Sequence, residues 1–185
     1  MFSKAAFILL IAILSIVFVI YSALPSQGFP KPYPGAKKSA EPADLETSIR
    51  QGYYIDGATR EEIITFYQTQ FSTTSTLGIP IPILRLNYPP EEAQTIIRDQ
   101  TKSTVLEEIV NPFRESIYIN GFEPKTADKF IYIEGKKWDK KIIIRYVHAP
   151  ILSRVVIATV TAFLFWVVSY VWIKQISNDI KLLKK

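Results

Sequence analysis

The sequence predicts an α+β protein in which a single small domain, an antiparallel sheet with helices on one side, lies between two transmembrane helices. Long apolar runs lie near both ends of the 185-residue chain, over residues 5–23 and 151–173. Helical and β-type patterns alternate over residues 43–150, a stretch long enough for one hydrophobic core. The composition agrees, because 48% of residues are hydrophobic although 21% are charged, and the apolar excess is concentrated in the two runs.

The first apolar run comes after a short N-terminus, residues 1–4, which carries a lysine. Residues 5–23 are interrupted only by Ser15, Tyr21 and Ser22, and their length approaches the roughly 20 apolar residues that a spanning helix needs. A cleaved signal peptide is the alternative, but its apolar core usually has about 7–15 residues and ends at a small-x-small site. Because Tyr21 occupies the first small position, we expect an uncleaved anchor.

Residues 24–42 are rich in proline and predict a linker. Its prolines are Pro25, Pro30, Pro32, Pro34 and Pro42. Because clustered prolines favour the extended polyproline II conformation, we expect a semi-rigid tether between the first span and the domain. The second span comes after His148, Ala149 and Pro150 with almost no slack, so the second span is expected to set the orientation of the domain.

The first part of the domain, residues 43–150, predicts a strand, a helix and an edge strand. Residues 48–55 are rich in β-formers, with Gly52 as a candidate bulge. A Thr-x-x-Glu capping box at Thr59 predicts a helix over residues 60–71. Its expected buried face comprises Ile63, Phe66, Tyr67 and Phe71. Two prolines within residues 79–86 cannot donate ladder hydrogen bonds, so this apolar stretch predicts an edge strand.

Two further helices are expected. Two prolines and two glutamates at residues 89–92 suit the first turn of a helix whose buried side would comprise Ala93, Ile96 and Ile97. A second capping box, at Thr104 and Glu107, predicts the most amphipathic helix of the chain. Its apolar stripe comprises Leu106, Ile109, Val110, Phe113 and Ile117. Pro112 is expected to kink this helix, and Gly121 to end it at positive φ.

Residues 129–134 and 141–147 predict an antiparallel hairpin with a long loop over residues 135–140. Around this loop lies a basic and aromatic patch, a candidate interaction site that comprises Lys136, Lys137, Trp138, Lys140 and Lys141. A solvated hairpin tip is the alternative. The second strand could hold the loop about 20–25 Å from the bilayer. Because the Debye length is only about 8 Å, the patch would meet an anionic envelope polymer or a partner protein rather than the chain's own lipids.

The second apolar run, residues 151–173, is long enough to span a bilayer. Arg154 near its start can snorkel to the interface, and Tyr170 and Trp172 near its end fit an interfacial aromatic belt. The basic tail, residues 174–185, carries four lysines. By the positive-inside rule we expect a two-pass protein of the cell membrane with both termini in the cytoplasm and an extracytoplasmic domain.

Ala158 and Ala162 give the second span a small-xxx-small face, on which another helix could pack closely. The simplest partner for this face is the chain's own first helix. Another membrane protein or a second copy of the chain is the alternative.

We expect neither an enzyme nor a cofactor or metal site. The chain has no cysteine, and its one histidine is His148, so it lacks thiol chemistry, Cys-ligated zinc and an evident triad. The glutamate pairs fall in predicted first turns of helices, where the helix dipole explains them, and no glycine-rich phosphate loop is present. The net charge of +5 comes from the membrane flanks, so nucleic acid is not an expected partner.

A YPGA sequence at residues 33–36, a β run and the stretch Thr59–Tyr67 together resemble uncharacterised extracytoplasmic domains of bacterial membrane proteins and lipoproteins. The resemblance covers about a fifth of the chain, from Tyr33 to Tyr67, and implies no activity.

Three functions fit this layout. The first is an interaction or scaffolding protein of the cell envelope, which presents its domain to another membrane or envelope protein. The second is a sensory input subunit, which would need a partner because the tail is too short for an output domain. The third is a polysaccharide chain-length regulator, for which only Pro150 matches the proline-rich approach to the second span. An envelope hydrolase is disfavoured because no catalytic set is apparent.

Overall fold

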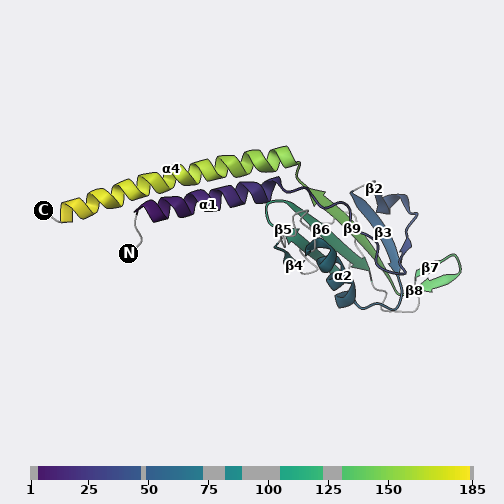
Figure 1. Cartoon of the computed structure of the whole chain (residues 1–185). Coiled ribbons are helices and arrows are strands. Elements are labelled where there is room, and N and C mark those ends of the chain that lie inside the picture. The colour runs from purple at the N-terminus through teal and green to yellow at the C-terminus, as the bar shows by residue number, and fades with distance from the viewer. Residues whose placement is uncertain (1–3, 47–48, 73–81, 89–104, 123–130, 184–185) are drawn as a thin grey trace. The chain divides into compact units, whose positions relative to one another are not determined.

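The computed structural model describes the chain apart from residues 1–3, 47–48, 73–81, 89–104, 123–130 and 184–185 (Figure 1). The chain divides into two compact units. The helical unit combines Met1–Pro25 with Ala149–Lys185, and the domain comprises Ser26–His148. The domain thus begins well before residue 43, where the sequence places its start.

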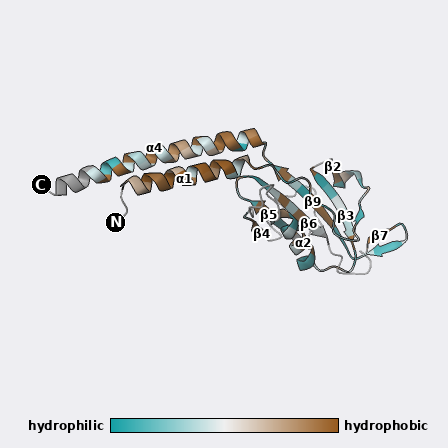
Figure 2. Cartoon of the chain, viewed as in Figure 1, coloured by the Kyte–Doolittle hydropathy of each residue, from teal (hydrophilic) through white to brown (hydrophobic). Residues whose placement is uncertain are grey.

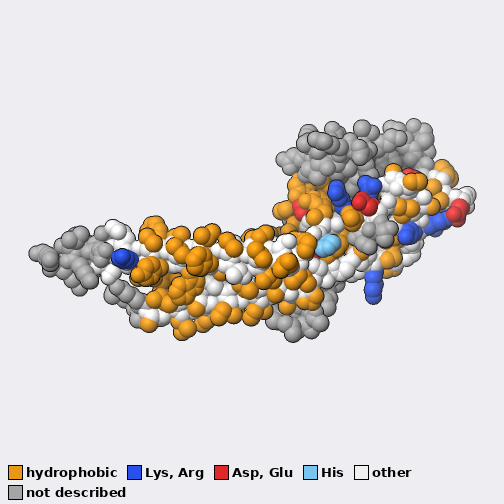
Figure 3. All heavy atoms as spheres, turned by 90° about the horizontal axis from the view of Figure 1, so that it is seen from above, with side chains coloured by type: hydrophobic (Ala, Val, Ile, Leu, Met, Phe, Trp, Pro, Cys, Tyr) orange, Lys and Arg blue, Asp and Glu red, His pale blue; other side chains and the backbone are white. Residues whose placement is uncertain are grey.

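The helical unit consists of α1 (Lys4–Ala23) and α4 (Ile151–Leu183). Within them, Ala5–Ala23 and Ile151–Ser177 are each long and apolar enough to cross a membrane. Hydrophobic residues dominate α1 and the first part of α4 (Figure 2), and many apolar side chains lie on the surface of the helical unit (Figure 3). α4 continues past residue 173, so most of the predicted tail belongs to the same helix.

The two helices pack side by side, with Ile11 of α1 and Ala158 of α4 buried. Arg154 is also buried, and its Nη2 donates a hydrogen bond to the carbonyl oxygen of Leu24 at 3.1 Å. The carbonyls at the C-terminal end of a helix lack partners within the helix and carry partial negative charge. Arg154 therefore caps the end of α1. The sequence had predicted instead that this side chain would snorkel to the membrane interface.

The domain is built on an antiparallel sheet. In spatial order its strands are β1 (Lys37–Lys38), β3 (Arg50–Ile55), β9 (Lys140–His148), β6 (Glu115–Phe122), β5 (Val105–Asn111) and β4 (Leu84–Tyr88). β2 (Leu45–Glu46) comes directly after the short 3-10 helix η1 (Pro42–Asp44) and also pairs with β3. β4 lies at an edge of this sheet, as the two prolines before it predict.

Helix α2 (Arg60–Ser72) covers one face of the sheet (Figure 1). It begins with the predicted capping box, in which Thr59 N donates to Glu62 Oε2 at 2.7 Å and Glu62 N to Thr59 Oγ1 at 3.3 Å. The hydrophobic core lies between α2 and the sheet. From α2 it receives Ile63, Ile64, Tyr67 and Phe71, and from the strands Tyr53, Ile55, Ile109, Ile117, Ile119, Ile142, Ile144 and Tyr146. The predicted inward face of α2 is confirmed, with Phe66 only partly buried.

The helix predicted after Thr104 is wrong, because these residues form β5 and β6. Leu106, Ile109 and Ile117 are buried as expected, but on two opposite faces of strands rather than on one helical stripe. β-Branched residues favour strands, and Pro112 cannot continue a helix. Gly121 lies within β6 opposite Val105 and is no helix terminus. The helix expected over residues 89–97 lies outside the described residues.

Asn111, Pro112, Phe113 and Arg114 form the turn between β5 and β6, closed by a hydrogen bond from Arg114 N to Asn111 O at 3.1 Å. Proline suits the second position of a turn, and Phe113 at the third position has a φ of +63°. The side chain of Phe113 is 75% exposed. The prediction that Phe113 is a core residue is therefore wrong.

The predicted hairpin pairs differently from expectation. β7 (Ile131–Ile133) pairs with β8 (Lys136–Trp138), which occupies the predicted loop, while β9 pairs with β3 and β6. Glu134 and Gly135 connect β7 and β8 with φ values of +52° and +76°. Two positive φ values in a two-residue connection are typical of a type I′ turn, which suits the twist of a hairpin.

The proline-rich segment is built into the domain between Gln27 and Lys38, instead of forming a free linker. Lys31 N donates to Gln70 Oε1 at 3.0 Å, and Tyr33 N to the hydroxyl of Tyr67 at 3.1 Å. Phe29, Tyr33 and Ala36 pack against the core, and β1 pairs with β3. We call residues 27–38 the strap.

Candidate functional site

The two ends of the sheet differ in their connection to the helices α1 and α4. β9 ends at His148, three residues before α4 begins at Ile151, and the strap begins four residues after α1 ends at Ala23. We call the end of the sheet at His148 the span-side end, and the end at Ile55 and Lys140, which pair with each other, the far end.

The predicted interaction residues lie at the far end, in β8 and at the start of β9. Trp138 is buried, and its ring centroid is 6.2 Å from that of Tyr54. Lys136 Nζ lies 4.2 Å from the centroid of the indole ring and 3.4 Å from Asp56 Oδ2. Trp138 therefore packs within the domain, while Lys136 covers its outer face.

Lys141 belongs to a polar cluster, with Asp44 buried and Glu41 at the surface, that attaches η1 to the sheet. Its Nζ lies 2.7 Å from both Glu41 Oε2 and Asp44 Oδ2. Burial disfavours the charged form of Lys141, but the hydrogen bonds to Asp44 and Glu41 outweigh burial and raise its pKa. Ser39 Oγ donates to Asp44 Oδ2 at 2.5 Å, and a Cβ at Gly52 would lie only 2.8 Å from the Asp44 side chain. This cluster ties Lys141 to η1, and the role of Lys141 in binding a partner stays a prediction.

Charged side chains remain around β8 and the start of β9. Lys137 belongs to β8 and Lys140 begins β9, and Asp139 lies between the two strands. Asp139 Oδ2 accepts a hydrogen bond from Gly57 N at 3.0 Å. That backbone hydrogen bond lowers the pKa of Asp139. The structure thus brings Lys136, Lys137 and Lys140 together at the far end with acidic neighbours, and their role in binding stays a prediction.

The two alanines predicted to pack helices have different surroundings. Ala158 is buried in the helical unit, where α1 and α4 are packed together. Ala162 is half-buried and lines an apolar groove of about 510 Å³ with Thr159, Phe163, Trp166, Val167 and Tyr170. The groove lies within the part of α4 that could cross a membrane. Acyl chains or another helix would fill it, and its occupant stays a prediction.

A second buried polar cluster lies at the span-side end and joins the strap to the sheet. Arg114 Nη2 lies 3.0 Å from Glu115 Oε1, and both side chains are fully buried. The Tyr146 hydroxyl donates to the carbonyl oxygen of Gln27 and lies 3.1 Å from Glu115 Oε2. Gln27 Nε2 donates to Phe71 O at 2.8 Å. We call Gln27, Arg114, Glu115 and Tyr146 the exit cluster, because it holds the two segments through which the chain leaves the domain.

A third cluster attaches α2 to the edge of the sheet. Glu107 of β5 is fully buried and accepts hydrogen bonds from Arg60 Nε at 3.0 Å and Arg85 Nε at 2.7 Å. Burial alone would raise the pKa of Glu107, but hydrogen bonds from the two guanidinium groups outweigh burial and lower it. Arg85 also binds Glu61 through Nη1 at 2.7 Å. The cluster links α2, β4 and β5.

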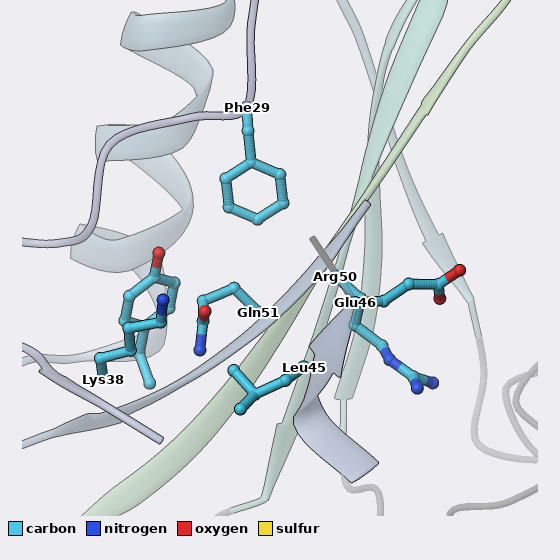
Figure 4. A pocket seen from close by; sticks show the side chains of 7 residues that line it. Phe29, Lys38, Leu45, Glu46, Arg50 and Gln51 are labelled. Carbon is cyan, nitrogen blue, oxygen red and sulfur yellow. The ribbon is translucent and has the colours of Figure 1, made fainter. Parts of the chain in front are cut away.

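A surface pocket of about 420 Å³ lies between the strap, β2 and β3 (Figure 4). Its lining comprises Phe29, Lys38, Leu45, Glu46, Arg50, Gln51 and Tyr53. Figure 4 shows the charged ends of Glu46 and Arg50 pointing away from Phe29, Lys38 and Gln51. Because ligand sites depend on polar groups that converge, this arrangement does not define a ligand.

The described parts of the chain contain no group of three or more His, Cys, Asp or Glu side chains placed to hold a metal ion. His148 stacks on Tyr146 with ring centroids 5.1 Å apart and an interplanar angle of 14°. No family model, curated protein or solved structure matches this chain.

Sequence reasoning did not identify the exit cluster or the Glu107 cluster. For the exit cluster a signal was present: Glu115, Ile117 and Ile119 alternate with polar residues, as expected of a strand with one buried face. Glu115 lies on the same side of this strand as Ile117 and Ile119, and all three side chains are buried.

Proposed function

We propose that the protein is a two-span membrane protein that presents its α+β domain for protein–protein interaction or scaffolding in the cell envelope, with both termini in the cytoplasm. The observation that carries the proposal is the exposure of α1 and α4. In each helix only 11% of the 18 most apolar consecutive residues are buried. A core helix of a soluble protein would bury its apolar side chains, whereas lipid can cover them in a membrane.

The architecture of the domain supports presentation rather than catalysis. Its carboxylates at Glu107, Asp44 and Glu115 are buried in ion pairs, which leaves them as structural groups. The far end carries Lys136, Lys137 and Lys140 with Asp56 and Asp139, a mixed-charge surface that suits the polar rim of a protein interface. Contact with a partner protein would also explain why the aromatic side chain of Tyr132 in β7 is 64% exposed.

A sensory input subunit is the second candidate, and the exit cluster favours it. Gln27, four residues after the end of α1, and Tyr146, five residues before the start of α4, bind each other through the Tyr146 hydroxyl. A ligand or protein that shifted the strands of the domain would therefore act on both connections to the spans. A signalling partner would complete such a pathway.

Topology and partner are tested together. Protease added to intact spheroplasts should digest the domain and spare a C-terminal tag, and cleavage of the tag with protection of the domain would refute the orientation. The chain purified in mild detergent should carry a stoichiometric membrane or envelope protein. The double substitution Lys137→Glu and Lys140→Glu should reduce this co-purification several-fold, while the double substitution Lys31→Glu and Lys38→Glu at exposed positions of the strap serves as the charge-matched control. If the far-end variant and the strap variant lose co-purification to the same extent, the far end is not the interaction surface.

A further inference from the structure

The span-side end of the domain exposes several hydrophobic side chains. The register pairs Glu115 with His148 and Asn111 with Glu115, so the turn at Pro112 and Phe113 projects beyond the last paired residues of β9. Asn111 Nδ2 also donates to Pro82 O at 3.2 Å, which places the start of β4 at the same end.

Four exposed hydrophobic side chains mark this end, one from each of four neighbouring segments of the sheet. They are Ile49, which precedes β3, Leu84 of β4, Phe113 of the β5–β6 turn and Val147 of β9. Leu84 is 55% exposed and Phe113 75%. Ile49 belongs to this end because its carbonyl accepts a hydrogen bond from Tyr146 N at 2.7 Å. We call these four residues the apolar rim.

The far end differs in chemistry. Its exposed or half-buried side chains include Asp56, Lys136, Lys137, Asp139 and Lys140. The two ends thus differ in degree: the end that leads to α4 carries the four exposed hydrophobic side chains beside the exposed charge of Arg145, and the opposite end carries the denser group of charges.

Chain connectivity keeps Val147 of the apolar rim close to the start of α4. From His148 to Ile151 the chain can reach at most about 11 Å, because an extended residue spans about 3.3–3.6 Å. Val147 directly precedes His148, and Glu115, the strand partner of His148, lies two residues beyond Phe113. Val147 and the β5–β6 turn are therefore linked to the start of α4 by short segments of chain and one strand pairing.

The backbone at Phe113 adds a second observation. A φ of +63° is costly for a bulky residue, since glycine or asparagine fits this turn position without strain. A large aromatic side chain held in this conformation and exposed to 75% contributes little to the core. Strained, exposed positions of this kind are characteristic of functional contacts.

We propose that the apolar rim rests in the interfacial region of the lipid bilayer, with Phe113 as its main anchor. Aromatic side chains favour the level of the headgroups, where they bury an apolar ring beside polar groups. The partner is lipid rather than protein because α4, which begins three residues after β9, would enter the same bilayer. This inference rests on the proposed function only in requiring that α4 spans the membrane.

The chain has no cysteine, so single substitutions place one spin label at a chosen site. Phe113→Cys, Tyr132→Cys and Val168→Cys would each be labelled in the full chain and reconstituted in phosphatidylcholine–phosphatidylglycerol vesicles. Tyr132 is the matched control, because it is an exposed aromatic residue in β7. Collision rates with oxygen, which partitions into lipid, and with a water-soluble nickel chelate then report the surroundings of each label.

We expect the oxygen-to-nickel ratio to be several-fold higher at position 113 than at position 132. Equal ratios at these two sites, with a lipid-type ratio at position 168, would overturn the apolar rim as a membrane contact and leave the span intact. A water-type ratio at position 168 would instead overturn the span itself. Shielding of position 113 from both reagents would assign this surface to a protein contact and overturn the proposal.

Discussion

Replacing Glu107 by glutamine tests whether the buried ion cluster holds α2 on the sheet. The substitution keeps the size of the side chain but removes the charge that faces Arg60 and Arg85. Breaking a buried pair typically costs about 3–5 kcal/mol, because the remaining charge is left uncompensated. Here the side chains of Arg60 and Arg85 are 40% and 29% exposed, so water stabilises them in part and we expect a loss of about 2–4 kcal/mol.

Urea denaturation of the full chain in mild detergent measures this loss. Trp138 is a suitable probe because it is buried in the domain, once Trp166 and Trp172 of α4 are replaced by phenylalanine. With a slope of about 1–3 kcal/mol per molar urea, the midpoint should fall by roughly 1–2 M. Glu61→Gln removes the exposed carboxylate of the same cluster and is the control, for which we expect a much smaller shift. Equal midpoints for the two variants would refute the role of Glu107 as a buried anchor.

The same pair predicts a pH dependence. The pKa of Glu107 is lower in the folded chain than the value of about 4.3 for an unfolded glutamate. Its contribution to stability is therefore present above pH of about 4.3 and is lost as the pH falls through the lower, folded pKa. The unfolding midpoint of the wild-type chain should fall more steeply with acid than that of Glu107→Gln. Parallel acid limbs would contradict this assignment.

Three further substitutions are read out by the same urea midpoints. Phe113→Gly should change stability by less than about 1 kcal/mol, because relief of the φ of +63° offsets the chain entropy of glycine and the lost detergent contact, and a loss of several kcal/mol would place Phe113 in the core. Gly52→Ala should cost about 1–3 kcal/mol, since its Cβ would lie 2.8 Å from the Asp44 side chain, and a neutral result would show that Asp44 moves freely. Tyr146→Phe should cost about 1–2 kcal/mol by removing the hydroxyl that binds Gln27, and an unchanged midpoint would argue against the exit cluster.

Local signals predicted the parts of the fold that depend on local physics. The apolar runs predicted the two long helices, and the capping box at Thr59 predicted the start of α2 within a residue. The composition of residues 48–55 predicted β3. In each case the residues that decide the structure lie within a few positions of one another.

The β5–β6 hairpin was missed because its core face carries charge. Glu107, Ile109 and Asn111 share the inward side of β5, so the strand lacks the alternation of apolar and polar residues that normally marks it. Glu107 is tolerated there because Arg60 and Arg85 arrive from α2 and β4, which are distant in the sequence. A single segment contains no trace of those partners, and its i, i+3, i+4 spacing matched a helix by coincidence.

The strap was missed for a related reason. Proline-rich composition predicts an extended backbone, and the backbone here docks on the domain because Tyr67 and Gln70 of α2 supply hydrogen-bonding groups at the right spacing. The extended form leaves the backbone N–H and C=O groups of the strap available to such partners. Composition therefore predicted the conformation of this segment but not where it binds.

The position of β9 has a mechanical consequence. It is hydrogen-bonded to β3 on one side over Lys140–Arg145 and to β6 on the other over Lys141–His148, and it leads to α4 through three residues. Antiparallel ladder bonds lie perpendicular to the strands, so a force directed along β9 loads both ladders in shear and cannot open them one bond at a time. A force of this direction on β9 should therefore be shared by its hydrogen bonds to both β3 and β6. The domain should stay folded under forces that would separate an edge strand such as β4.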